Sequence, residues 1–208
     1  GSKTIDPKIE WKRVEHVLKN FKKKYKKICL SIDTRKSDLM IKSIKFGADL
    51  INDVSGFEYD TKALSKLKNF NISKVLHHMQ GTPNTMQKNP RYKNVLLDIY
   101  DFFEKKIESN PKDRKIILDP GIGFGKDLKH NITILNNISI FHTLGFPVML
   151  GVSRKRFIKD ISGNNDSKER LGGTISSCLS SMMQGVQILR VHDVNEVNQA
   201  IKVFKSLN

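Results

Sequence analysis

The segment Lys115-Ile-Ile-Leu-Asp-Pro-Gly-Ile-Gly-Phe-Gly-Lys126 shows a pattern that recurs along the rest of the chain. Its apolar residues 116–118 predict a short buried strand, which Pro120 ends because proline lacks a backbone N–H donor. The glycines that follow allow turns and close backbone approaches that side chains would prevent. The strand therefore delivers the carboxylate of Asp119 to a glycine-rich loop, an arrangement suited to holding a small polar molecule.

Five further apolar segments also end in polar residues, and they alternate with segments of helical spacing, in which apolar residues recur every three or four positions. The predicted strands are 28–34, 49–56, 73–79, 116–119, 147–155 and 185–193. The predicted helices are 8–27, 36–46, 61–69, 93–109, 128–144, 168–183 and 195–206. This alternation predicts an α/β fold with a parallel sheet covered by helices.

Six strands are two fewer than a TIM (β/α)₈ barrel contains, and such a barrel has roughly 250 residues. We therefore expect a TIM barrel of which this chain supplies about six βα units, strands three to eight. Residues 1–208 are expected to form a single, N-terminally incomplete barrel domain. Without the first two strands, segments 28–34 and 186–191 would be exposed sheet edges.

The composition is strongly basic, with 37 Lys and Arg against 21 Asp and Glu and a formal charge of +16. Such a surplus could indicate nucleic-acid binding. The lysines, however, are spread over the polar faces of nearly every predicted helix, which is typical of solvated surfaces. We therefore expect no nucleic-acid partner and keep that function as an alternative based on charge alone. The surplus would still help to attract an anionic substrate.

The sequence shows no signal peptide and no apolar run of about 18 residues, so we expect no membrane association. Cys29 lies in a predicted strand and Cys178 in a predicted helix, without the spacing of a metal or redox site. We interpret both as small buried residues of a reduced compartment, which predicts a cytoplasmic protein.

The ends of the predicted strands offer Asp33, Asn52, Asp119 and Lys155. Two carboxylates, an amide and an ammonium suit a flat heterocycle rich in hydrogen-bond donors and acceptors. Each residue also has a structural explanation: Asp33 could cap the next helix, Asn52 could satisfy a turn, and Lys155 could be solvated. The repetition of the pattern over six strands favours a binding site.

Cations follow the last two predicted strands. Ser153-Arg-Lys-Arg156 places three cations after an apolar strand, where a phosphate or carboxylate could bind. Arg190 and His192 lie two residues apart on one strand and so face the same side. His77 and His78 are adjacent and face opposite sides, which favours a structural or substrate-packing role over a shared metal ion.

Seven motifs, in order across nearly the whole chain, together resemble the dihydropteroate synthase family. They are Ser31-Ile-Asp-Thr34, Ile51-Asn-Asp-Val-Ser-Gly56, His78-Met-Gln-Gly-Thr-Pro83, Asp119-Pro-Gly-Ile-Gly-Phe124, Ser153-Arg-Lys155, Arg170-Leu-Gly-Gly-Thr174 and Arg190-Val-His-Asp-Val194. The resemblance implies a (β/α)₈ barrel and a transferase of folate biosynthesis. Such an enzyme uses Mg²⁺ to condense 7,8-dihydropterin-6-ylmethyl diphosphate with 4-aminobenzoate, releases pyrophosphate, and is a target of sulfonamides. A homodimer formed through the last helices is also implied.

The resemblance also implies a role for each matching residue. The pterin ring would be held by Asp33, Asn52, Asp119 and Lys155, with Phe124 and Met79 as apolar neighbours. The diphosphate would be bound by Arg190, His192 and Asn52, and the aminobenzoate by Ser153 and Lys155. The implied catalytic residues are Lys155, Arg190 and His192.

This sequence departs from the family at its N-terminal side and at one strand end. A first-strand Asn-Val-Thr-Pro-Asp-Ser-Phe segment, whose Asn helps to bind Mg²⁺, and a Gly-Glu-Ser-Thr-Arg loop have no counterpart, so no metal ligand is assigned. His77 stands where relatives often have methionine. Two alternatives stay open: a catalytically impaired pterin-binding module or fragment, and the pterin-binding domain of a corrinoid methyltransferase. The Ser-Arg-Lys and Arg-Val-His motifs favour the synthase over the methyltransferase.

Overall fold

The computed structural model describes residues 4–207, and strands and helices alternate along them as expected. The strands are β1 (Ser31–Asp33), β2 (Leu50–Asp53), β3 (Ser73–His77), β4 (Ile116–Asp119), β5 (Met149–Leu150) and β6 (Ile188–Leu189). The α-helices are α1 (Pro7–Lys24), α2 (Ser37–Lys45), α3 (Ala63–Leu67), α4 (Val95–Glu108), α5 (Leu128–Asn136), α6 (Arg156–Ser162), α7 (Leu171–Met183) and α8 (Val194–Leu207). Two 3₁₀ helices, η1 (Ile138–Leu144) and η2 (Ser167–Arg170), complete the described elements.

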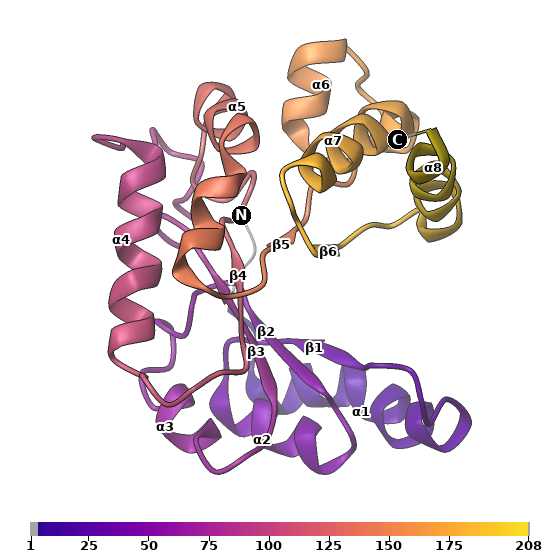
Figure 1. Ribbon diagram of the computed structural model, residues 1–208. Coiled ribbons are helices and arrows are strands. Elements are labelled where there is room, and N and C mark those ends of the chain that lie inside the picture. The colour runs from indigo at the N-terminus through magenta and orange to yellow at the C-terminus, as the bar shows by residue number, and fades with distance from the viewer. Residues whose placement is uncertain (1–3, 208) are drawn as a thin grey trace.

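All six strands are parallel and follow one another in chain order. Strands β1 to β4 form a four-stranded sheet, and β5 pairs with β6 in a second sheet. A bridge between Leu118 and Val148 joins β4 to the segment before β5. The expected parallel α/β arrangement is confirmed, but within residues 4–207 the sheet does not close into a barrel. Figure 1 shows β1–β4 with α1, α2 and α3 in the lower part and β6 with α6, α7 and α8 in the upper part.

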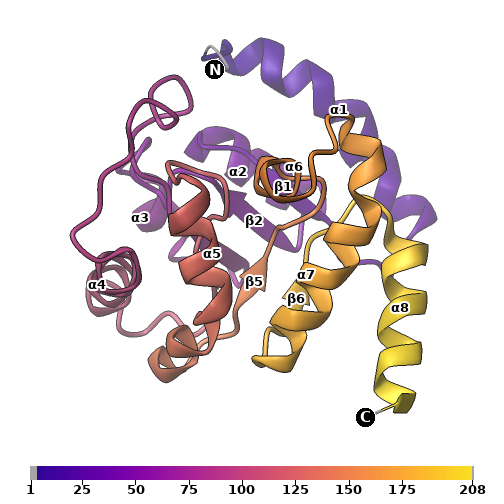
Figure 2. The same cartoon turned by 90° about the horizontal axis from the view of Figure 1, so that it is seen from above.

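Most residues of β2, β3 and β4 are buried, whichever face of the strand they lie on. Strand residues Ile51, Val75 and Leu118 are fully buried, as are Ile99 and Phe103 of α4. The buried apolar residues of α4 recur every four positions, so one face of this helix packs on the sheet. From above, helices are seen around the strands (Figure 2). None of the helices described is long and apolar enough to cross a bilayer.

Several element bounds differ from the sequence-based prediction. Cys29 precedes β1 and is exposed, so its predicted burial in a strand was wrong, whereas Cys178 is buried in α7 as expected. The helix predicted over 128–144 divides at Asn137 into α5 and η1. Helix α6 was not predicted, because seven residues make only two turns and give a weak periodic signal.

Candidate active site

The side chains of Asp33 and Asn52 meet where β1 and β2 end in register. The Asn52 amide Nδ2 donates to Asp33 Oδ2 at 3.0 Å, and the buried Asn52 Oδ1 has no protein partner among the described residues. Asp33 is exposed at the end of β1, and partial desolvation of its carboxyl by the surrounding chain raises its pKa. Helix α2 begins after Lys36 without a side-chain cap, so the capping explanation for Asp33 was wrong.

His77 and Asp119 are paired in register at the ends of β3 and β4. The Asp119 Oδ1 accepts from the Gly121 N–H at 2.8 Å, while its Oδ2 lies 4.0 Å from His77 Nε2. His77 Nδ1 must donate to the Val54 carbonyl, 3.1 Å away, because a carbonyl only accepts. Burial lowers the pKa of His77 to about 4, so its Nε2 is an acceptor at neutral pH. The pair therefore presents two acceptors, suited to N–H groups of a ligand.

Lys155 lies directly before α6 and reaches the loop that follows β4. Its Nζ donates to the Ile122 carbonyl and lies 4.2 Å from the centre of the Phe124 ring. The same ring packs edge-on against His77, with 4.5 Å between ring centres. Burial lowers the pKa of Lys155 to about 8, opposed by Asp119. The explanation of Lys155 as a solvated side chain was therefore wrong.

His192 lies beside the buried Ser153 at the ends of the second sheet. The ring Nδ1 of His192 is 2.9 Å from Ser153 Oγ, and the backbone N–H of His192 donates to the same oxygen at 3.3 Å. Ser153 is 6% exposed, whereas His192 is exposed. The residue expected to bind the aminobenzoate and one of those expected to bind the diphosphate are therefore in direct contact.

Arg190 follows β6 and has an exposed side chain. Its backbone N–H donates to Leu150 O at 2.9 Å, which continues the β5–β6 pairing one residue beyond the end of β6. The charge of Arg190 lowers the pKa of Asp33, against the larger effect of burial, and it also lowers the pKa of Lys155. Arg190 therefore lies close enough to act electrostatically on Asp33 and Lys155. We call the region at the carboxyl ends of the strands that these residues share the mouth.

The predicted cluster of three cations after β5 is only partly formed. Arg154 pairs with Asp193, with 3.0 Å between Nε and Oδ2, and Arg156 is exposed with its Nε 3.6 Å from Asp160 Oδ1. Both arginines are thus engaged by carboxylates, and Lys155 is the member of this cluster that reaches the mouth.

His77, the last residue of β3, and His78 face opposite ways, as predicted. His77 lies toward Asp119 and Phe124, whereas His78 Nδ1 is 2.9 Å from the Nζ of Lys126. Within residues 4–207 no three His, Cys, Asp or Glu side chains gather as a metal site. Met79 follows them and is half-buried.

Three buried polar residues near the mouth were not predicted as site residues. They are His77, Asp53 and Lys126, which are 3%, 0% and 3% exposed. Burial raises the pKa of Asp53 to about 6, although Ser55 donates two hydrogen bonds to its Oδ1. The position of His77 and Asp53 at strand ends was a usable signal. Nothing in the sequence indicates that Lys126 is buried.

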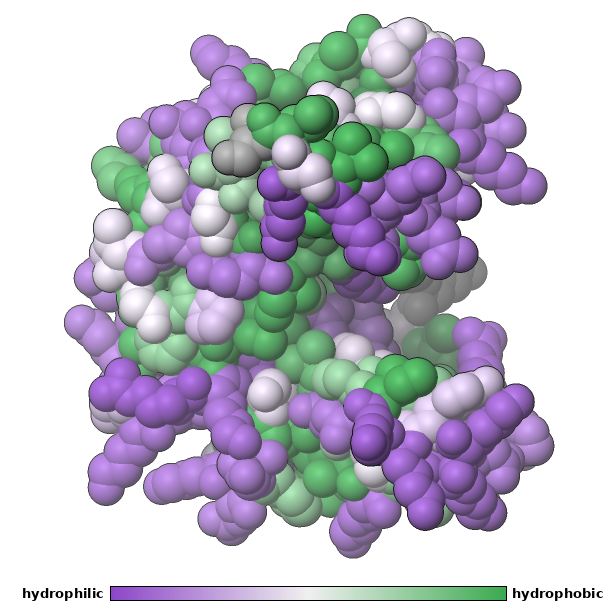
Figure 3. Space-filling model, turned by 45° about the vertical axis from the view of Figure 1, so that its right-hand side comes forward, coloured by the Kyte–Doolittle hydropathy of each residue, from purple (hydrophilic) through white to green (hydrophobic). Residues whose placement is uncertain are grey.

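A hollow of about 620 Å³ lies at the opposite, amino ends of β3 and β4. Its lining includes Lys74 and Asp113, which pair with each other at 3.0 Å, together with exposed lysines. The acceptors and cations that converge from several strands lie instead at the carboxyl ends, where parallel α/β folds bind their ligands. We therefore assign the site to the carboxyl ends. Seen from the side, the molecule is hollowed between its upper and lower parts (Figure 3).

Comparisons with known proteins identify the family of the chain. Residues 1–192 match the family described as "Pterin binding enzyme". The dihydropteroate synthase of Neisseria meningitidis serogroup B is 35% identical over 215 residues, covering 100% of this chain and 75% of that protein. These matches bear out the resemblance seen in the motifs.

Two solved structures share the fold. A Yersinia pestis dihydropteroate synthase with a sulfonamide drug complex has a TM-score of 0.94 at 33% identity, covering 100% of this chain and 76% of that one. A Xanthomonas albilineans dihydropteroate synthase in complex with 7,8-dihydropteroate has a TM-score of 0.90 at 29% identity, covering 100% and 77%. The expected barrel class is thereby confirmed, although the sheet described here is open.

Proposed function

We propose that the residues at the strand ends of this chain carry out dihydropteroate synthesis, since the chain belongs to the dihydropteroate synthase family of pterin-binding transferases. The substrates are 7,8-dihydropterin-6-ylmethyl diphosphate and 4-aminobenzoate, and the products are dihydropteroate and pyrophosphate. The relatives reported above are all synthases, so the methyltransferase alternative has no support from them.

The pterin ring is proposed to lie among Asp33, Asn52, Asp119 and Lys155, with Phe124 and Met79 beside it. Its N–H groups would donate hydrogen bonds to Asp119 Oδ2 and to the neutral His77 Nε2, two atoms that lie 4.0 Å apart. The free Oδ1 of Asn52 offers a further acceptor among the described residues, and the Lys155 ammonium a donor. A neutral ring is held by such directed bonds, because it carries no net charge to attract it.

The diphosphate is proposed to lie by Arg190, His192 and Asn52, and the aminobenzoate by Ser153 and Lys155. The methylene carbon–oxygen bond breaks, and the diphosphate leaves with the bonding electrons. The amine nitrogen forms the new carbon–nitrogen bond and releases a proton. Arg190 and His192 act catalytically by stabilising the charge that grows on the leaving group. Lys155 acts catalytically by holding the ring and the aminobenzoate in position for the new bond. No side-chain nucleophile is required.

Mg²⁺ belongs to the proposal through the chemistry of the diphosphate. The residues of this mouth do not form a ready metal site: no three metal-binding side chains gather among the described residues, and cations line the diphosphate side. Magnesium often binds through substrate phosphates with few protein ligands. We therefore propose that Mg²⁺ enters with the diphosphate, and no step above depends on it.

Two further expectations concern inhibition and assembly. A sulfonamide complex is known for the Yersinia relative, so we propose that sulfonamides bind here in the aminobenzoate position beside Ser153. A homodimer through the last helices and a cytoplasmic location stay predictions.

The convergence of polar side chains from β1 to β4, with Lys155 and Arg190 beside them, is the observation that carries this proposal. The test is pyrophosphate release by the purified chain with both substrates, with and without Mg²⁺. Release that requires both substrates supports the synthase reaction. Pterin binding without release would favour the alternative of a catalytically impaired module.

A further inference from the structure

The loop after β4 is held by an unusual row of side-chain bonds. Four consecutive carbonyls, those of residues 122–125, each accept a hydrogen bond from a side chain. The donors, in order, are Lys155 Nζ, Gln87 Nε2, Lys126 Nζ and Tyr92 Oη. The loop backbone is therefore fixed from several directions.

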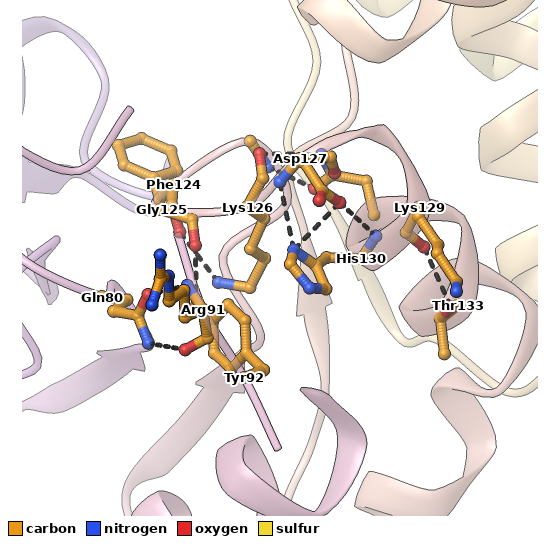
Figure 4. A network of polar contacts seen from close by, with 12 residues as sticks. Gln80, Arg91, Tyr92, Phe124, Gly125, Lys126, Asp127, Lys129, His130 and Thr133 are labelled. Atoms are coloured by element: carbon orange, nitrogen blue, oxygen red, sulfur yellow. Dashed lines mark hydrogen bonds and ion pairs between the residues drawn. The ribbon is translucent and has the colours of Figure 1, made fainter. Parts of the chain in front are cut away.

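Lys126 is the buried member of this row, and Figure 4 shows its side chain directed toward Tyr92. Its Nζ lies 2.9 Å from His78 Nδ1, 2.9 Å from Phe124 O and 3.3 Å from His78 O. An ammonium has three N–H donors, and these three acceptors use them all. Lys126 thereby ties the loop after β4 to the end of β3.

The two segments that Lys126 joins are in close backbone contact. A methyl group at Gly121 would lie 1.9 Å from His78 O, and one at Gly125 would lie 2.4 Å from Gln80 O. The loop can approach β3 this closely because both positions are glycine. Phe124 lies between these glycines, so the ammonium holds the backbone that carries the Phe124 ring.

We propose that Lys126 is a positioning residue of the pterin site: through His78 and the Phe124 carbonyl it sets where the Phe124 ring stands against Lys155 and His77. This inference rests on the proposed function. Lys126 acts through other residues and does not itself contact the reacting atoms. Burying an ammonium without a carboxylate bonded to it is costly, which is consistent with a role beyond filling space.

The test is the affinity of the purified chain for a 7,8-dihydropterin without phosphates, measured by fluorescence, beside its affinity for inorganic pyrophosphate. Lys126→Met keeps the length of the side chain and removes the donors. We expect its pterin dissociation constant to rise about tenfold, since bonds to charged groups are involved. Pyrophosphate binding should change less than about twofold, because Arg190 and His192 do not depend on this loop.

Two controls separate positioning from loss of charge or of folding. Lys129→Met removes an exposed lysine three residues away and should leave both affinities unchanged. His78→Asn keeps an acceptor near the position of Nδ1, whereas His78→Leu does not. The first should retain most of the pterin affinity and the second should lose it, so the test stands even where Lys126→Met folds poorly.

The pH dependence of pterin affinity adds a measurement that a purely structural role of Lys126 would not change. Burial lowers the pKa of Lys126 to about 7, opposed by Asp119 and reinforced by Lys155, while burial keeps His78 and Tyr92 neutral. As the pH rises through 7, the ammonium of Lys126 loses a proton and keeps two of its three N–H donors. Pterin affinity should therefore weaken. Lys126→Met should show no such step there.

Equal pterin affinity in Lys126→Met and the wild type, or equal losses for pterin and pyrophosphate, would overturn this inference alone. Failure of the wild type to bind any pterin would instead overturn the proposed function, and this inference with it.

Discussion

The two sheets of the molecule present their polar residues differently. At the ends of β2–β4, Asn52, His77 and Asp119 are 6%, 3% and 5% exposed and are held by neighbouring strands and loops, whereas Asp33 at the end of β1 is exposed. After β6, Arg190 and His192 are exposed, and the β5–β6 pair adjoins β4 through one described bridge. A neutral ring requires buried hydrogen-bonding groups in fixed positions, whereas a multiply charged diphosphate is attracted by exposed cations even through water. The difference matches the two moieties of the proposed substrate.

The largest expected effect comes from a substitution in the loop after β4, in the sheet formed by β1–β4. In Gly121→Ala the new methyl group would lie 1.9 Å from a backbone oxygen, at a φ of +69° that favours glycine. We expect a loss of more than about 2 kcal/mol in the free energy of unfolding, measured with urea. Gly172→Ala in α7 is the matched control, because its methyl group meets no atom within 4 Å. Its stability should change by less than about 1 kcal/mol.

Substitutions of Lys155 and Arg190 compare the proposed pterin-binding and diphosphate-binding residues directly. Lys155→Ala should weaken a pterin without phosphates by roughly 10- to 100-fold, because it removes a charged hydrogen-bond donor. Arg190→Ala should leave that ligand within about twofold and weaken only phosphorylated ligands. Isothermal titration with both ligand types measures this. Equal losses on both ligands would contradict the division of roles.

The pH dependence of stability reports on Lys126 and Lys155. Burial lowers the pKa of Lys126 to about 7 and of Lys155 to about 8, from the ordinary value of 10.5. Between pH 7 and 10.5 the unfolded chain therefore binds more protons than the folded chain, and these groups make stability rise with pH. Lys126→Met should show a smaller rise in urea midpoints between about pH 7 and 10. An identical rise would mean that Lys126 is not desolvated.

The smallest effect is expected at His77. His77→Met removes one neutral acceptor beside Asp119 and places there the residue that relatives often have. The pterin dissociation constant should rise about fivefold, corresponding to about 1 kcal/mol for one hydrogen bond. Tighter binding by the variant would show that the imidazole does not accept from the ring.

The sequence allowed the strand order and most strand ends to be predicted, because apolar spacing and glycine-rich turns are local signals. It also indicated which side chains would share one edge, since parallel strands end together. The pairing of Arg154 with Asp193 and the burial of Lys126 were not predictable. Both depend on contacts between segments distant in the chain, 39 residues apart for the arginine and 48 for Lys126 and His78.

A crystal structure of this chain with a bound 7,8-dihydropterin tests the central claim most directly. We expect the ring to lie at the carboxyl ends of the strands, in hydrogen-bond contact with Asp33, Asn52, Asp119 and Lys155. A ring bound instead in the hollow at the amino ends, beside Lys74 and Asp113, would contradict it.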